Sequence, residues 1–380
     1  MRILLIGEFS RLHNSLKEGL IENGHEVLLV STHDGFKAFP TDLSYQPRIF
    51  NKTGLKWLVK VIYKLSRISL IQLESAWRFY RFLPKLMDYD VVQLINENSI
   101  KTHPRLEIWL IKKLINRNNK LFLLSCGADY SSVKYAAEKQ FRYSILTPYH
   151  ENPANKKQFQ FVLRYLKPSY KRLHEFLYKN ISGVISSDLD YHFPLIDNSK
   201  YKGMIPNPIN VDKIEFKTSG VSDKLVIFHG INSQNYIKKG NRYFDEALLK
   251  IEELYQSKIE IIRTIDLPYK KYLEAYNNCD ILFDMVYAYD QGYNALEAMA
   301  RGKVVFTGAE KEWLEHYGLE ADTVAINALP DVDYLVKKLS MLIEEKNLIK
   351  TISRNARDFI KEHHHYINIA EQYLKTWKSE

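Results

Sequence analysis

The stretch that decides the fold class is residues 2–30, which read RILLIGEFSRLHNSLKEGLIENGHEVLLV. Residues 2–6 are a nearly continuous apolar run, which is typical of a strand buried on both faces of a sheet. Gly7 closes that run, and three leucines at helical spacing follow it. Residues 27–30 are again apolar and predict a second strand. Strand, helix and strand in this order form a βαβ unit, and such a unit implies a parallel sheet.

The same alternation continues along the chain. Further strands are predicted at residues 91–95, 121–125, 183–186, 225–228, 259–262, 281–284 and 303–306, with helical segments between most of them. Residues 205–210, IPNPIN, contain two prolines and predict a stiff, extended connection between the two halves. We therefore expect two α/β domains with parallel sheets, joined at this connection.

Composition and charge narrow the class of protein. The chain has 380 residues, 46% of them hydrophobic, so two domains are favoured and a disordered chain is excluded. The only cysteines are Cys126 and Cys279, which excludes a disulfide scaffold and suits a reducing cytoplasm. No stretch reaches the ~18 apolar residues of a membrane-spanning helix, and the apolar opening is too short for a signal peptide. The formal net charge of +9 indicates an anionic partner, such as phosphate groups, nucleic acid or an acidic membrane surface.

Motifs of several other enzyme classes are absent. Neither predicted domain has G-x-G-x-x-G after its first strand, and no P-loop or G-x-S-x-G elbow occurs. Residues 188–190, DLD, resemble the metal-binding D-x-D motif of another transferase architecture, but this motif is short and common by chance. Residues 363–365 are consecutive histidines, which cannot share one helix face, so we expect them to be solvated. The sequence therefore predicts no metal site, and it offers no convincing pair of carboxylates.

The most informative stretch for function is residues 290–305, DQGYNALEAMARGKVV. A loop that contains Gly292 enters a helix, and the free amides at a helix N-terminus suit a diphosphate. Glu297 is expected in the first turn of this helix, where its carboxylate could accept hydrogen bonds from the vicinal hydroxyls of a ribose. The alternative is a purely structural role, in which the glycine starts the helix, the Glu297 carboxylate interacts favourably with the helix dipole, and the apolar residues pack in the core.

A resemblance to a known family makes this stretch more specific. Residues 292–305 resemble the donor-site signature of retaining GT-B glycosyltransferases of the GT4 type, G-x-x-x-L-E-A-M-A-x-G-x-P-V. Residues 228–240 resemble the first loop of that family's C-terminal domain, where a lysine before a glycine binds the donor diphosphate. Residues 266–281 and the N-terminal opening are also similar to the family, so the resemblance covers most of the chain.

The resemblance implies the architecture and the reaction. The expected fold is GT-B, in which two Rossmann-like domains face a central cleft. The domains would be an acceptor-binding domain at 1–206, a nucleotide-sugar-binding domain at 207–365, and a helix at 366–380 that crosses back to the first domain. The expected activity is transfer of a hexose-type sugar from a nucleotide diphosphate sugar to an acceptor hydroxyl, with retention, in surface polysaccharide or glycolipid assembly. Neither a cofactor nor a metal is expected.

The resemblance also implies the site residues. The expected catalytic residues are Asp129, Lys239 and Glu297. The expected donor-binding residues are Gly230, Asn232, Lys238, Lys239, Arg242, Asp290, Gly292, Tyr293, Asn294, Ala295, Leu296 and Glu297. The expected acceptor-binding residues are Gly7, Ser10 and His13.

The sequence departs from the family pattern in two places. The first of two glutamates eight positions apart would fall at Tyr289, so either Asp290 substitutes for it or the contact to the donor sugar differs. The arginine that precedes the lysine is also missing, and Lys238 or Arg242 would have to supply its charge.

Two site assignments stay open between a functional and a structural role. Asp129 follows a predicted strand and either binds sugar hydroxyls or caps the next helix. His13 either meets the acceptor or is a surface histidine. Two alternatives to a transferase also stay open: a GT-B-like binding or scaffold subunit without catalysis, and a sugar-nucleotide 2-epimerase. No recognised motif supports nucleic-acid binding.

Residues 55–82 predict contact with a membrane surface. Lys56, Lys60, Lys64 and Arg67 form one basic stripe at helical spacing, and apolar and aromatic residues flank it. The expected location is cytoplasmic, with peripheral binding to the inner face of an anionic membrane that carries a lipid-linked acceptor. The alternative is an ordinary helix of the first domain, with its apolar face on the sheet and its lysines in water.

Overall fold

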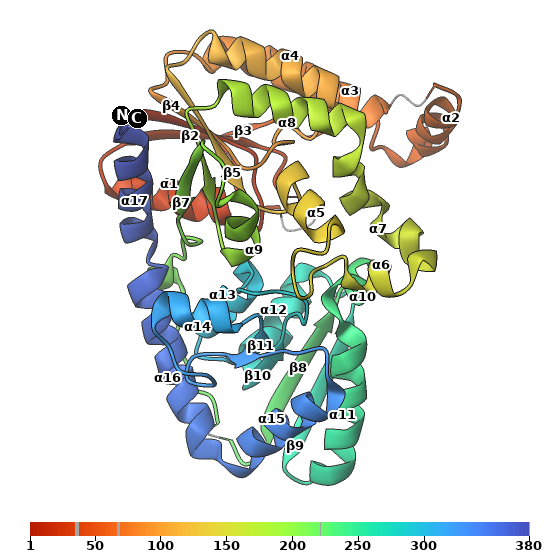
Figure 1. The fold of residues 1–380 in the computed structure, drawn as a ribbon, viewed down its shortest axis with the longest axis vertical. Helices are drawn as coiled ribbons and strands as arrows, with labels where there is room; N and C mark the ends of the chain where they lie inside the picture. The colour runs from red at the N-terminus through yellow and green to blue at the C-terminus, as the bar shows by residue number, and fades with distance from the viewer. Residues whose placement is uncertain (35–37, 67–68, 221, 380) are drawn as a thin grey trace.

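Two parallel β-sheets, one in each half of the chain, organise the structure, and helices cover both faces of each (Figure 1). This computed structural model describes residues 1–34, 38–66, 69–220 and 222–379. The strands are β1 (Arg2–Ile6), β2 (Glu26–Ser31), β3 (Leu43–Ser44), β4 (Val91–Leu94), β5 (Lys120–Ser125), β6 (Gly183–Ser186), β7 (Tyr201–Met204), β8 (Leu225–Ile231), β9 (Ile259–Ile265), β10 (Ile281–Phe283), β11 (Val304–Thr307) and β12 (Ile326–Asn327).

The helices lie between these strands and continue beyond the last of them. In the first half they are α1 (Leu12–Glu22), α2 (Lys56–Ser66), α3 (Leu70–Phe82), α4 (Pro104–Ile115), α5 (Tyr130–Ala137), α6 (Thr147–Glu151), α7 (Lys156–Leu163), α8 (Pro168–Asn180) and α9 (Leu189–His192). In the second half they are α10 (Tyr236–Lys239), α11 (Asn241–Tyr255), α12 (Tyr269–Asn278), α13 (Tyr293–Ala300), α14 (Lys311–Tyr317), α15 (Val332–Glu344), α16 (Lys346–His363) and α17 (Tyr366–Lys378).

The first sheet has seven strands in the order β3-β2-β1-β4-β5-β6-β7. All of its pairs are parallel, as the apolar runs predict, and β1 pairs with β2 on one side and with β4 on the other. The strand order reverses at β1 and β4, and ligands of such open sheets bind outside the carboxyl ends of the strands at this switch point. Gly7 stands there, directly after β1.

The second sheet has five strands in the order β12-β11-β10-β8-β9. Its switch point lies between β8 and β10, which are parallel neighbours. The segments after these two strands carry most of the residues that the sequence assigns to the donor. The predicted donor residues therefore lie at the carboxyl ends of the central strands of the second sheet.

The two halves are connected twice. The segment after β7 leads into the second sheet, and the chain returns through α16 and α17. Here Ile209 donates its N–H to the carbonyl of His364 at 2.7 Å, and Tyr366 donates to the carbonyl of Ile209 at 3.2 Å. His364 is only 3% exposed and its Nδ1 lies 2.9 Å from the carbonyl oxygen of Asn207. The prediction that all three histidines are solvated was therefore wrong, because the returning chain covers His364 with the interdomain connection.

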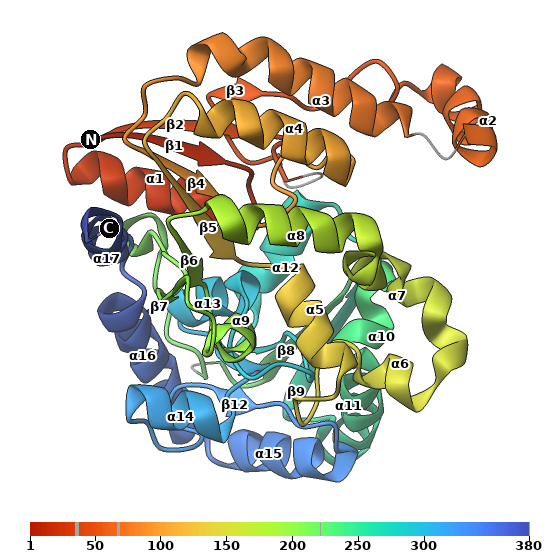
Figure 2. The ribbon, with the colours of Figure 1, turned by 45° about the horizontal axis from the view of Figure 1, so that its top comes forward.

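The last helix, α17, packs against α1 of the first domain (Figure 2). A Cβ added at Gly19 of α1 would lie 2.2 Å from the carbonyl oxygen of Tyr366, so only glycine permits this approach. Trp377 is fully buried and donates its Nε1–H to Gln93 of β4 at 3.1 Å. Its carbonyl accepts a hydrogen bond from Lys120 of β5 at 2.9 Å. The end of the described chain is thus part of the first domain's core.

Helix α2 lies at the periphery, away from both sheets (Figures 1 and 2). None of its residues is buried, and the exposed fractions of Trp57 and Leu65 are 65% and 81%. The alternative that its apolar face packs on the sheet is therefore wrong. Arg67, the fourth basic residue of the predicted stripe, and Ile68, an apolar residue beside it, lie outside the described residues. Among the described helices, none has the length and apolar character to cross a membrane.

Candidate active site

The switch point of the second sheet holds an ion pair. Lys239, at the end of α10, places its Nζ 2.9 Å from Oδ1 of Asp284, the residue that follows β10. The Asp284 side chain is 3% exposed and that of Lys239 is 33% exposed. Asn294 of α13 donates to the same carboxylate oxygen at 3.3 Å. A cation is therefore held in place at the edge of the sheet, with one face still open to solvent.

The N-terminus of α13 lies beside this ion pair. Gly292 is its N-cap and is exposed, and among the described residues no side chain caps the helix. Tyr272 of α12 donates its hydroxyl to Oδ1 of Asn294 at 3.0 Å, and Tyr276 donates to the carbonyl of Asn294 at 3.0 Å. Because these bonds fix the first turn, the uncapped amides form a rigid site for an anion.

Glu297 is half-buried on α13, but its position in the helix differs from the prediction. The helix begins at Tyr293 rather than at Ala295, so Glu297 is the fifth helical residue and lies in the second turn. The side chains of Ala295 and Leu296 are fully buried in the core. These two residues can meet a ligand only through their backbone.

The loop after β8 surrounds the same edge of the sheet. A Cβ added at Gly230 would lie 2.5 Å from Cε2 of Tyr272, so glycine is required for packing. Asn232 is exposed and accepts a hydrogen bond from the N–H of Gln234 at 3.0 Å. Lys238 is half-buried, and burial lowers the pKa of its ammonium.

Two further residues predicted to bind the nucleotide sugar contact the first domain and the interdomain connection. Arg242 is exposed, and its guanidinium lies 3.7 Å from the Glu151 carboxylate of the first domain. Tyr293 is buried, with its hydroxyl 2.5 Å from Oγ of Ser15, and it donates to the carbonyl of Pro208 at 2.8 Å. The Tyr293 side chain therefore bonds to α1 and to the interdomain connection, and the residue's predicted contact with the donor falls to its backbone.

The predicted acceptor residues lie at the switch point of the first sheet, but His13 is not on the surface. It is fully buried, and its Nδ1 lies 2.8 Å from the carbonyl oxygen of Gly7. Burial lowers the pKa of this imidazole to about 3, so the ring is neutral. Gly7 is buried with φ at +88°, and a Cβ there would lie 2.3 Å from Ile95. Ser10 is half-buried and donates its N–H to Asp34 at 2.8 Å.

Asp129 is fully buried at the N-terminus of α5. One carboxylate oxygen accepts from the N–H of Ser132 at 2.8 Å, and the other accepts from the hydroxyl of Ser125. Both residues of this capping box are in place. The structure therefore favours the capping alternative, because both carboxylate oxygens accept hydrogen bonds inside the first domain, and the catalytic role of Asp129 stays a prediction.

Three carboxylates meet where the two domains face each other. Asp190 of α9 accepts hydrogen bonds from the amides of Tyr289 and Asp290 at 3.1 and 3.3 Å. Asp290 in turn accepts from the amide of Leu189 at 3.2 Å, and Asp188 lies on the same short loop. The statement that the chain offers no convincing pair of carboxylates was thus wrong, because residues 188–190 and Asp290 come together only in the folded chain. Within the described residues, no group of three or more His, Cys, Asp or Glu side chains is arranged to hold a metal ion.

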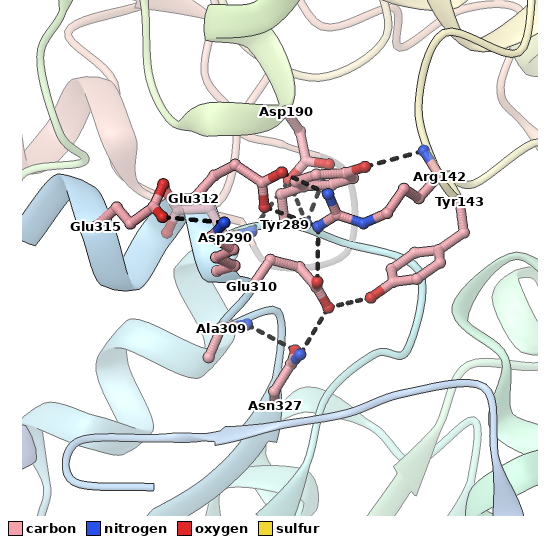
Figure 3. Close-up of polar contacts among 11 residues, drawn as sticks. Arg142, Tyr143, Asp190, Tyr289, Asp290, Ala309, Glu310, Glu312, Glu315 and Asn327 are labelled. Atoms are coloured by element: carbon pink, nitrogen blue, oxygen red, sulfur yellow. Dashed lines mark hydrogen bonds and ion pairs between the residues drawn. The ribbon is translucent and has the colours of Figure 1, made fainter. Parts of the chain in front are cut away.

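A polar network joins the domains beside these carboxylates (Figure 3). Arg142 extends from the first domain and donates to Glu310 at 2.8 Å and to Glu312 at 2.7 Å. Its guanidinium carbon lies 4.8 Å from the centre of the Tyr289 ring. Tyr143 also donates to Glu310. Tyr289, which stands where the family has its first glutamate, therefore packs against the other domain.

Comparison with known protein families supports a glycosyltransferase, the class of enzyme that a diphosphate site at this sheet edge suggests. Residues 239–375 match the family described as glycosyl transferase-like. This segment begins at Lys239 and includes Asp284 and the whole of α13. No curated protein sequence matches the chain.

Solved structures match the whole chain. HepE from Anabaena, in complex with UDP and glucose, has a TM-score of 0.60 and 14% identity, with 100% of each chain covered. Sucrose-phosphate synthase from Thermosynechococcus elongatus has a TM-score of 0.61 and 13% identity, with 100% of this chain and 99% of that chain covered. A putative UDP-N-acetylglucosamine 2-epimerase from Listeria monocytogenes has a TM-score of 0.57 and 11% identity, with 99% and 95% covered.

The chain therefore has the GT-B fold, and its residues 239–375 match the glycosyl transferase-like family. The predictions of this fold and of an enzyme in the glycosyltransferase class are confirmed. The fold alone does not separate transferases from 2-epimerases, because both occur among the similar structures. The family match is what favours the transferase.

Proposed function

We propose that the protein transfers a hexose-type sugar from a nucleotide diphosphate sugar to an acceptor hydroxyl, with retention of the anomeric configuration. The observation that carries this proposal is the convergence of the Lys239 ammonium and the uncapped α13 amides at one edge of the second sheet. Both groups attract a diphosphate, and both belong to the glycosyl transferase-like segment.

The chemistry follows from where negative charge develops. When the glycosidic bond to the diphosphate breaks, the leaving diphosphate gains charge. Asp284 holds Lys239 in place and the helix holds the α13 amides, so we expect both to stabilise this charge with little reorganisation. Glu297, on the same helix, is assigned to the donor's ribose hydroxyls. These protein groups supply the stabilisation that a metal gives in other transferases, so neither a metal nor a cofactor is part of the proposed mechanism.

A panel of nucleoside diphosphates and nucleotide sugars tests this proposal. A ligand that binds only the folded protein at 100 times its Kd raises the free energy of unfolding by ~2.7 kcal/mol, so binding is measurable as a thermal shift. Slow release of nucleotide from the stabilising sugar, and the anomeric configuration of the product by NMR, test catalysis and retention. Conversion of the sugar nucleotide to its 2-epimer would favour the epimerase, and binding without turnover would favour the scaffold alternative.

We also propose that the acceptor is carried by an anionic membrane, as in surface polysaccharide or glycolipid assembly, and that α2 binds the protein to its cytoplasmic face. Lys56, Lys60 and Lys64 are exposed along the helix, and none of its apolar residues is buried by the protein. Exposed aromatic side chains continue on α3 and α4, at Trp77 and Trp109. An amphipathic helix with this composition suits a membrane interface, where each basic residue contributes ~1 kcal/mol near an anionic surface.

Charge reversal on α2 is expected to abolish this binding. Wild-type protein should sediment with anionic vesicles and not with neutral ones, and a Lys56/Lys60/Lys64→Glu variant should remain in the supernatant. The matched control is Lys337/Lys361/Lys375→Glu, which changes the net charge equally at exposed positions far along the chain. Equal loss of binding in both variants would show that net charge alone is responsible and would reject the role of α2.

A further inference from the structure

A cavity of about 140 Å³ lies between the two domains beside the proposed diphosphate site. Its first-domain wall is mostly apolar and includes Val133, Phe141 and Leu146. Its second-domain wall is formed by residues 285, 287, 288 and 290–292. A cavity of ~150 Å³ holds one benzene ring, so this one has room for a single six-membered ring. Because Gly292 both lines the cavity and caps α13, a ring here would lie next to the amides assigned to the diphosphate.

The polar lining of this cavity is formed mainly by oxygen atoms. Asp188, Asp190 and Asp290 all line it, as does Gln291. Gln291 is 1% exposed and donates its Nε2–H to the carbonyl of Gly308, while its Oε1 has no hydrogen-bond partner among the described residues. Oδ1 of Asp188 is also buried without a partner in the described part of the chain. Unpartnered buried acceptors are costly, and a ligand with hydroxyl or ammonium donors would satisfy them.

Among the described residues, no lysine or arginine pairs with these three carboxylates. Their donors are backbone amides and, for Asp188, the hydroxyl of Ser187 at 2.9 Å. The guanidinium of Arg142, on the other side of Tyr289, is engaged by Glu310 and Glu312 (Figure 3). Burial raises the pKa of Asp188 well above its usual range, that of Asp190 to about 7 and that of Asp290 to about 6, and the charge of Asp290 adds to the shifts of the other two, so Asp290 is the carboxylate that is ionised most readily. A further negative charge in the cavity would therefore be strongly disfavoured.

We propose that this cavity holds a reacting sugar ring and selects rings with neutral or amino substituents over rings with a carboxylate. The apolar wall suits the carbon-rich face of the ring, and the acidic side accepts hydrogen bonds from its hydroxyl or ammonium groups. This inference rests on the proposed sugar transfer and deepens it, because it names the class of sugar. The ring could belong to the donor or to the acceptor, and the two are separated by experiment.

Two series of probes test the selectivity. The first comprises the glucose, glucosamine and glucuronic acid derivatives of the nucleoside diphosphate that binds in the panel above, measured by calorimetry. The second comprises methyl glucoside, methyl glucosaminide and methyl glucuronide, measured by saturation-transfer NMR. We expect the acidic sugar to bind at least about tenfold more weakly than the other two in one series, because like charges are juxtaposed. Selectivity in the first series assigns the cavity to the donor, and selectivity in the second assigns it to the acceptor.

Asp290→Asn provides the matched variant, because the pKa of Asp290 is raised least of the three carboxylates and the substitution removes its charge while keeping its shape. We expect it to bring the ratio of neutral to acidic affinities close to one, and Asp190→Asn to shift the ratio in the same direction. Asp197→Asn, at an exposed position of the same domain, should leave the ratio unchanged. Equal affinity of neutral and acidic sugars for the wild type in both series would overturn the inference. Failure of every nucleotide in the panel would contradict the proposed function instead, and the methyl glycosides would still test the cavity.

Discussion

Lys239→Ala is expected to lower kcat/KM for the nucleotide sugar by about 100-fold or more, mostly through kcat. Removal of one preorganised group that stabilises charge in a transition state typically costs ~2.7–4 kcal/mol. Lys239 is the cation that Asp284 holds at the edge of the second sheet, 2.9 Å from the carboxylate. Steady-state kinetics with a donor from the binding panel measure both parameters, and a loss confined to KM would assign Lys239 to ground-state binding instead.

Two further variants separate this effect from a loss of structure. Lys239→Ala leaves Asp284 buried without its cation, so the free energy of unfolding should also fall, and Lys239→Ala/Asp284→Asn should restore part of that stability without restoring kcat. Lys238→Ala, at the adjacent position, keeps the ion pair and is the matched control. If Lys238→Ala loses activity and Lys239→Ala keeps it, the charge assigned to Lys239 belongs to Lys238.

The sequence predicted the two sheets well because buried parallel strands are continuous apolar runs. The runs at residues 2–6 and 281–284 correspond to β1 and β10 within one residue. The start of α13 was predicted less well, since Tyr293 and Asn294 extend the helix beyond the Ala295–Ala300 segment that has strong helical propensity. Their addition moves Glu297 out of the first turn.

The candidate site was predictable only where it is contiguous in sequence. Lys239 and the glycine before α13 belong to local motifs, and the structure brings both to the switch point of the second sheet. The acidic side of the cavity was not predictable, because its carboxylates come from segments far apart in sequence. The hydrogen bond between the Leu189 amide and Asp290, for example, joins residues that are 101 positions apart. Asp284 was also missed, since an aspartate after a strand gives no sign that it pairs with Lys239.

The environment of α2 shows a different limit. An apolar stripe with lysines beside it has the same pattern whether the stripe packs on a protein or on a membrane. The sequence therefore left both alternatives open for residues 55–82. The fold removes one of them, because no residue of α2 is buried, and the other now depends on the vesicle experiment.

Trp377→Ala is expected to lower the free energy of unfolding by about 3–5 kcal/mol, the usual cost of removing a buried tryptophan. Trp377 is fully buried, its ring centre lies 6.4 Å from that of Phe122, and its Nε1–H donates to Gln93. The substitution therefore creates a cavity in the first domain and leaves the buried Gln93 oxygen without this donor. Chemical denaturation monitored by circular dichroism gives the change directly.

The same experiment tests whether α17 belongs to the first domain in energetic terms. Gln372→Ala lies on the exposed face of the same helix and should change stability by no more than ~0.5 kcal/mol. Because α17 packs on α1 and β4 while α16 packs on α13, detachment of α17 would also loosen the connection between the domains. The Trp377→Ala variant should therefore expose residues 209–214 to faster amide hydrogen exchange. Equal stability of the two variants would show that α17 contributes little to the core of the first domain.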